Sequence, residues 1–395
     1  MALLTRILIA SAIFFLTATA QGQGSDDATD FALPADEVGD QIGDGGLDLD
    51  DADFTGNPAN SLFGWWPEDL VVAPIPGYSP QLGWSLTLAA AYFVTEREVD
   101  GPPPSMLGGF GFASDNGSYM LGLGGRFHLR DDRLRLKAGV GYMDLRYRYY
   151  GSGLLENDLG ISLDILQTGP VYFASASART WRRLYLGAGF LGGSIDASPR
   201  LNREDTGFFD PVLGVNLGGL LLPIEWDSRD HEQFPRRGTF VKGRGVVYRE
   251  ELGSDFDGEI FQLAYNRYMP VRDADVLALR AFFRTAEGDV PFFLLSTFGG
   301  DTDLRGYPSG RYRDRMMYAL QGEYRWQLNE RWILTGFAGF GEVAANIGDF
   351  GDELLPAGGV GARFVLSRKH RMSLSADIAV GKNGAEFYVG VGEAF

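Results

Sequence analysis

The stretch that decides the fold is Tyr119-Met-Leu-Gly-Leu-Gly-Gly-Arg-Phe-His-Leu129. Its odd-numbered positions carry tyrosine, leucine or phenylalanine, apart from one glycine, and its even-numbered positions carry mainly glycine, arginine and histidine. Successive side chains of a β-strand point to opposite faces, so this alternation predicts a strand. One apolar face and one small or charged face is typical of a strand that separates lipid from the lumen of a transmembrane barrel.

The same alternation recurs along the chain from about residue 62. In residues 318–327, for example, Tyr, Leu, Gly, Tyr and Trp share one face, and Gln, Glu, Arg and Gln share the other. The first strand is the least regular, because its prolines are tolerated only at the edge or end of a strand. We predict sixteen strands, near 62–75, 82–94, 105–115, 118–129, 134–149, 160–177, 183–195, 211–226, 239–250, 257–269, 276–286, 316–327, 332–343, 356–367, 371–381 and 386–395.

The connections between these strands sort by length. One set is short (130–133, 179–182, 271–275, 329–330 and 368–371), and the alternate set includes long segments (150–159, 196–210, 287–315 and 344–355). Outer-membrane barrels have short periplasmic turns and longer outer loops. A soluble β-sandwich would also alternate, but its turns would not sort in this way. The predicted fold class is therefore all-β: a transmembrane antiparallel β-barrel of about 16 strands over residues 61–395, with both termini on the periplasmic side.

The N-terminal residues predict export. An arginine at position 6, an apolar run over 7–16 and the small-x-small end Ala18-Thr-Ala20 are typical of a signal peptide over residues 1–20. The alternative is a membrane anchor, but a spanning helix needs about 20 apolar residues. Within residues 21–60, the segment 26–53 carries ten Asp and one Glu and no Lys or Arg, which predicts a disordered acidic linker.

Composition narrows the chemistry. The chain has no cysteine, so disulfides and thiolate metal sites are excluded. The aspartates of 26–53 lack the continuation of a calcium loop, and the net charge of −17 disfavours a nucleic-acid partner. We predict no metal and no cofactor.

Two segments stand out from the strand pattern. The first is Trp226-Asp-Ser-Arg-Asp-His-Glu-Gln-Phe-Pro-Arg-Arg-Gly238, on a predicted periplasmic turn. Its Asp-x-Arg-Asp cluster can pair internally, while the proline fixes φ and the glycine supplies backbone freedom before the next strand. The second is Phe298-Gly-Gly-Asp-Thr-Asp-Leu-Arg-Gly-Tyr307, inside the longest loop, with five strands after it.

Both segments resemble the BamA/TamA family of outer-membrane barrels (the bacterial surface antigen family), in which a D-x-R-D-x4-P-x2-G turn and an R-G-[FY] lid loop recur. The resemblance covers residues 60–395. It assigns the turn motif to Asp227, Arg229, Asp230, Pro235 and Gly238. It assigns the lid-loop motif to Gly299, Gly300, Arg305, Gly306 and Tyr307.

The resemblance also implies a site for the loop. In the family the loop folds into the lumen, and its arginine contacts an F-x-[DE] pair on the next strand but one. That pair corresponds to Phe340 and Glu342 here, and Glu323 on the intervening strand is a second candidate partner. Residues two apart share a face, so Phe340 would stack on the guanidinium while Glu342 accepts its hydrogen bonds. Arg305 could equally serve only to hold a plug in place.

The sequence departs from the family in two places. We expect no periplasmic repeat domain, the part that receives client proteins, in residues 21–60, and the C-terminal segment carries Glu393 where the family prefers an apolar residue. The expected function is outer-membrane biogenesis or transport of a protein or lipid, through a lid loop and a seam between first and last strands that can open. The alternative is a passive pore or a structural protein without a client.

The expected partners are outer-membrane lipids and an unidentified client or periplasmic protein, and the oligomeric state stays open. No catalytic residue is assigned, because no Gly-x-Ser-x-Gly elbow and no evident Ser–His pair occurs.

The location is directly testable. We expect the mature protein to fractionate with outer membranes and to show heat-modifiable mobility on gels, as detergent-resistant barrels do. Recovery in the soluble periplasmic fraction would contradict the barrel interpretation.

Overall fold

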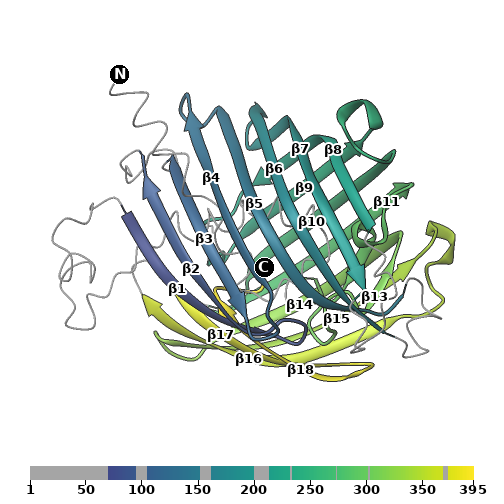
Figure 1. Ribbon diagram of the computed structural model, residues 1–395. Coiled ribbons are helices and arrows are strands. Elements are labelled where there is room, and N and C mark those ends of the chain that lie inside the picture. The colour runs from purple at the N-terminus through teal and green to yellow at the C-terminus, as the bar shows by residue number, and fades with distance from the viewer. Residues whose placement is uncertain are drawn as a thin grey trace.

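The computed structural model describes residues 70–94, 105–151, 162–199, 213–231, 234–272, 274–300, 303–367 and 372–395. The expected signal peptide and acidic linker lie outside these ranges. The described chain forms a closed barrel of 16 antiparallel strands in sequence order, which confirms the predicted fold class (Figure 1). Among the described residues, no helix is long and apolar enough to cross a membrane.

Most barrel strands follow the predicted ranges closely, but the first, predicted over 62–75, is described over 70–79. Their bounds are β1 Leu70–Ser79, β2 Gly83–Phe93, β3 Met106–Ser114, β4 Tyr119–Leu129, β5 Leu134–Tyr149, β6 Leu163–Trp181, β7 Leu184–Pro199, β8 Leu213–Asp227, β9 Gly238–Tyr248, β10 Gly258–Pro270, β11 Val276–Gly288, β14 Met316–Gln327, β15 Trp332–Ala344, β16 Leu355–Ser367, β17 Met372–Gly381 and β18 Gly384–Val391.

Alternation along each strand separates a lipid face from a lumenal face. On β4, the side chains of Tyr119 and Leu121 are exposed on the outside, whereas Met120 and Arg126 are buried. The side of the barrel that carries residue 70 also carries the short turns at 130–133, 182–183 and 328–331. It is therefore the periplasmic side.

The ends of the chain depart from the predicted strands. The last strand was predicted over 386–395, but β18 ends at Val391. Gly392, with φ of 92°, turns the final residues away from the wall, and its N–H bonds to the Ser373 carbonyl. Phe395 packs inside the barrel against the cluster formed by Phe240, Tyr268, Val276 and Ala278.

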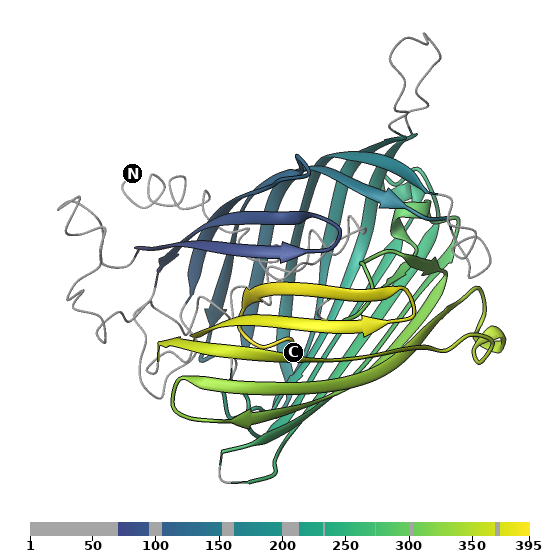
Figure 2. The ribbon, with the colours of Figure 1, turned by 90° about the horizontal axis from the view of Figure 1, so that it is seen from below.

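The seam that closes the barrel is its weakest contact. β1 and β18 share a single register pair, Tyr78↔Val389, whereas β1 and β2 are paired along all of β1. Pro74 and Pro76 lie in β1. Proline has no backbone N–H, and residues two apart in a strand direct their N–H groups to the same edge. Both missing N–H donors therefore fall on one edge of β1, and we infer that it is the edge at the seam. Figure 2 shows β1, in purple, beside the yellow β17–β18 pair.

The assignment of faces leads to a stability prediction. Val140 in the middle of β5 is 48% exposed on the outer face. An arginine on the lipid face near the bilayer midplane costs about 2–4 kcal/mol. Val140→Arg should therefore lower the free energy of unfolding in lipid vesicles by that order, while Val140→Ala, which adds no charge, should lower it much less. Equal effects of the two substitutions would contradict the assignment.

Candidate functional site in the barrel lumen

The segment between β11 and β14, residues 289–315, folds into the barrel; we call it the lumenal loop. It contains a short 3-10 helix (η2 Phe292–Leu294) and a two-stranded sheet (β12 Ser296–Phe298 and β13 Tyr312–Asp314) that the sequence did not predict. Its side chains Phe298, Leu304, Tyr307 and Tyr312 are fully buried. They pack on lumen-facing residues of three barrel strands, namely Met317, Ala319, Val343, Leu355 and Ala357.

Arg305 is the centre of this contact. Its guanidinium donates to Glu323 on β14 at 2.6 Å and to Asp377 on β17 at 2.7 Å. It also lies over the ring of Phe337 on β15, 3.4 Å from the ring centroid. The side chain is fully buried. A buried guanidinium is tolerated when its charge is paired and its planar face is covered, and both conditions hold here.

The ion pairs extend beyond Arg305 to a cluster of three arginines and three carboxylates. Arg325 donates to Glu323 at 2.8 Å, and Arg363 pairs with Asp377 at 2.6 Å. Glu393, from the turned-in C-terminal end, lies 3.3 Å from Arg325 and 3.4 Å from Arg363. Formal charges in this cluster cancel. We call its members the lumenal ion cluster: Arg305, Glu323, Arg325, Arg363, Asp377 and Glu393.

The prediction that Arg305 contacts Phe340 and Glu342 is wrong. Phe340 is 40% exposed on the outer face, opposite Leu320 in the register. Glu342 is buried, but on the outer side at the extracellular end of β15, where its carboxylate accepts from the backbone N–H groups of Gly351 and Glu353. The odd-numbered residues of β15 face the lumen, so the ring that covers Arg305 is Phe337, three residues earlier.

Two physical constraints explain why the loop motif contains glycines. Gly299, Gly300 and Gly306 all have positive φ, which suits glycine. Gly306 also passes so close to β17 that an added Cβ would lie 3.1 Å from the Val380 carbonyl carbon. Its N–H donates to the hydroxyl of Tyr388 on β18 at 3.0 Å. Glycine beside Arg305 thus lets the loop backbone approach the wall that the arginine contacts.

Tyr307 fixes the loop on the same wall. Its hydroxyl donates to the Pro356 carbonyl at 2.7 Å and accepts from the Lys382 N–H at 3.1 Å. Phe337, Arg363, Asp377 and Tyr388 were not among the predicted site residues. For Asp377 a signal existed, since it is the one carboxylate on the polar face of an otherwise serine-bearing strand.

The periplasmic turn motif forms a cluster of ion pairs and hydrogen bonds between β8 and β9. Asp227 and Arg229 pair at 2.7 Å, and Arg229 lies over Phe240, 4.0 Å from its centroid. Asp230 accepts from the N–H groups of Arg236 and Arg237 at 2.9 and 3.1 Å. Burial alone would raise the pKa of Asp230, but the N–H groups of Arg237 and Arg236 outweigh it and leave that pKa lowered.

The last two motif positions shape the backbone of this turn. Gly238 has φ of 115°, and an added Cβ would lie 2.3 Å from the Ser228 carbonyl oxygen. Pro235 is buried. The turn motif therefore sets the geometry of one hairpin and lies on the periplasmic side, away from Arg305.

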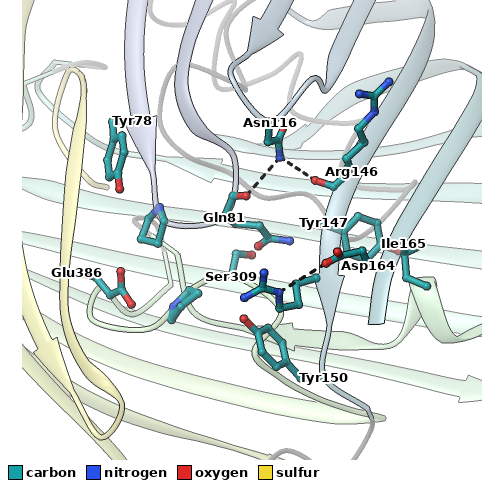
Figure 3. Close-up of a pocket in the computed structure, with 13 residues that line it drawn as sticks. Tyr78, Gln81, Asn116, Arg146, Tyr147, Tyr150, Asp164, Ile165, Ser309 and Glu386 are labelled. Carbon is teal, nitrogen blue, oxygen red and sulfur yellow. Dashed lines mark hydrogen bonds and ion pairs between the residues drawn. The ribbon is translucent and has the colours of Figure 1, made fainter. Parts of the chain in front are cut away.

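A cavity of about 710 Å³ lies at the extracellular end of the lumen (Figure 3). It is bounded by Tyr78 at the end of β1, Glu386 on β18 and Ser309 of the lumenal loop. The opposite side is formed by β5 and β6, where Arg148 lies 3.6 Å from Asp164. The loop and the seam thus border one space.

These features define a class: an outer-membrane-type barrel with a weak seam and a long loop anchored in its lumen. Residues 219–395 match the Omp85 superfamily domain. The barrel is similar to BamA from Haemophilus ducreyi lacking POTRA domains 1-3, with 14% identity and a TM-score of 0.58, over 82% of this chain and 70% of that chain. Residues 219–395 are thus an Omp85 superfamily domain, and the barrel as a whole has a BamA-like fold.

Two further solved structures have the same fold. CdiB from Acinetobacter baumannii matches with 11% identity and a TM-score of 0.54, over 82% of this chain and 59% of that one. CdiB from Escherichia coli matches with 11% identity and a TM-score of 0.55, over 82% and 63%. The chain therefore spans less than two thirds of the length of either CdiB. No curated protein matches it in sequence.

The geometry of Arg305 predicts that Phe337, and not Phe340, helps to hold the lumenal loop in place. Removing one partner of a buried ion pair costs about 3–5 kcal/mol. Arg305→Ala should therefore free the lumenal loop, seen as faster amide hydrogen exchange in residues 296–298 and 312–314. Arg305→Lys should rescue poorly, because an ammonium lacks the planar fork that reaches Glu323 and Asp377 together.

Phe337→Ala should speed exchange in the same segments, whereas Phe340→Ala should leave it unchanged because that ring faces outward. The placement of Arg305 is contradicted if its truncation leaves the loop protected, or if Phe340→Ala frees the loop.

Proposed function

We propose that this barrel acts in outer-membrane biogenesis or in transport of a protein or lipid, and that the seam between β1 and β18 opens to do so. The observation that carries the proposal is the single register pair at Tyr78↔Val389. Separating two strands exposes unpaired N–H and C=O groups, which costs several kcal/mol for each group in lipid. A seam with one pair lowers that cost and offers a strand edge to a client chain.

The lumenal loop is physically linked to that seam. Tyr388 of β18 accepts from the Gly306 N–H and donates to the Tyr307 carbonyl at 3.2 Å. Arg305 holds β17, the neighbour of β18, through Asp377. A shift of β18 therefore changes contacts of the loop, and release of the loop loosens β18. This coupling supports a transport role for the loop.

The function that we propose does not include catalysis. Of the histidines within the described residues, His128 bonds to Asp132 through Nδ1 and His231 accepts from the Phe234 N–H. Neither contact is to a serine hydroxyl, which a Ser–His hydrolase would need.

A disulfide across the seam tests the proposal. The chain has no cysteine, so Tyr78→Cys with Val389→Cys gives a single, reducible link between β1 and β18. Formed in the native outer membrane, it should cause loss of the barrier to large antibiotics, and reductant should restore the barrier. The matched control is Ala73→Cys with Ala89→Cys, which links β1 to β2 at an intact register pair.

If cells with the seam linked keep a normal barrier, the seam does not need to open. The protein is then better described as a passive pore or a structural barrel.

A further inference from the structure

The two strands that meet at the seam present different edges, and β1 presents the poorer one. The β1–β2 ladder runs past Pro74 and Pro76 without a break, so neither proline occupies a donor position on the β2 side. The even-numbered residues of β1 therefore direct their backbone groups to the seam. Of the five such residues in 70–78, the two prolines have a C=O but no N–H. The middle of this edge can accept hydrogen bonds but cannot donate them.

The edge of β18 is complete by comparison. Because Tyr78 directs its backbone groups to the seam, Val389 opposite it does the same, and so do the other odd-numbered residues of β18. The strand reads Gly-Ala-Glu-Phe-Tyr-Val-Gly-Val and contains no proline, so each of these positions has both an N–H and a C=O. In the same register, Ala385 and Phe387 fall beyond Ser79, where β1 ends.

The register also gives a reason for the short seam ladder. Continued toward the periplasm, it sets Pro76 opposite Val391 and Pro74 opposite Glu393. Pairs of this type exchange two N–H···O=C bonds, and a proline can form only one of them. Glu393 is turned inward to the lumenal ion cluster instead. The prolines thus weaken closure of the seam, and they leave fewer N–H groups unpaired on the edge of β1.

We propose that an incoming client strand pairs with the edge of β18, and not with that of β1, and that Pro74 and Pro76 impose this choice. An antiparallel strand added along β1 would leave two of its carbonyls opposite the prolines, without donors. This is costly in lipid, where no water replaces the missing donor. A strand added along β18 finds a donor and an acceptor at every seam-directed position. The inference rests on the proposed opening of the seam, and it names the partner as an extended polypeptide.

Pairing at β18 would act on the strand that contacts the lumenal loop. The hydroxyl of Tyr388 accepts from the Gly306 N–H and lies 3.2 Å from the Tyr307 carbonyl oxygen. Glu386, on the same face of β18, borders the cavity beside the loop (Figure 3). On the outer face, Phe387 is 39% exposed and lies 5.9 Å from the ring of Tyr78. The strand that fits this edge therefore has apolar side chains on its lipid face.

Capture of synthetic peptides compares the two edges in the full-length protein in lipid vesicles. The probe for β18 copies residues 70–79 with Pro74→Val, Pro76→Val and Tyr78→Cys, and its target in the barrel is Val389→Cys. The probe for β1 copies residues 384–395 with Phe395→Cys. Its target is Val72→Cys, which lies opposite position 395 when the seam register is continued.

A third target controls for adhesion of an apolar peptide to the outside of the barrel. Val360 is 65% exposed on β16, a strand that is paired on both sides. Val360→Cys therefore presents an equally accessible thiol without a free strand edge, and each probe is compared with it.

Mild oxidation should join the first probe to Val389→Cys well above the level at Val360→Cys. The second probe should join Val72→Cys only weakly, because each carbonyl left unpaired lowers capture by roughly tenfold. Pro74→Val with Pro76→Val in the barrel should raise capture at Val72→Cys by roughly 100-fold, because both missing N–H groups are then present. Heat-modifiable mobility on gels checks that this variant folds. If it does not, the comparison of the two edges in the barrel with its prolines still decides.

The proposal is overturned if capture at Val72→Cys equals or exceeds capture at Val389→Cys while the prolines are present. It is also overturned if a folded Pro74→Val, Pro76→Val barrel shows no rise at Val72→Cys. Capture no higher at Val389→Cys than at Val360→Cys would overturn it too. In that last case, a loss of the antibiotic barrier on linking the seam would still support seam opening, and a lipid would replace the polypeptide as the transported species.

Discussion

The structure depends on one constraint: an arginine that is withdrawn from water must keep its charge paired. Arg305 meets it by contacting Glu323, Asp377 and the face of Phe337, which lie on three different strands. The loop that carries it is thereby held against the β14–β17 wall. Since a buried pair adds little net stability but is costly to break, its main effect is to specify one position for the loop.

The same constraint explains the C-terminal end. In the sequence, Glu393 interrupts the apolar pattern of the C-terminal segment at a position where the family prefers an apolar residue. In the structure Glu393 is the third carboxylate of the lumenal ion cluster, and it lies close to both Arg325 and Arg363. Turning Glu393 inward ends β18 at Val391 and leaves most of the seam edge of β1 without a ladder. Charge balance in the lumen and weak pairing at the seam are therefore linked.

The barrel could be predicted because its signal is periodic and repeats sixteen times, so an error in one strand does not change the topology. The contacts of Arg305 could not, because they depend on which face of β15 points inward. That strand has apolar or small residues on both faces, Phe337 on one and Phe340 on the other, and the period alone does not choose between them. The register with β14, which pairs Phe340 with the lipid-facing Leu320, settles the choice. The β12–β13 sheet was missed because three-residue strands carry too little pattern.

The most direct test of the account is the accessibility of a thiol beside Arg305. Leu304 is fully buried, and the chain has no cysteine of its own, so Leu304→Cys reports on this position alone. In native outer membranes it should resist a water-soluble maleimide, and it should react rapidly once Glu323→Gln removes one partner of Arg305. Rapid labelling of Leu304→Cys with Glu323 intact would mean that the loop is not held in the lumen by its arginine.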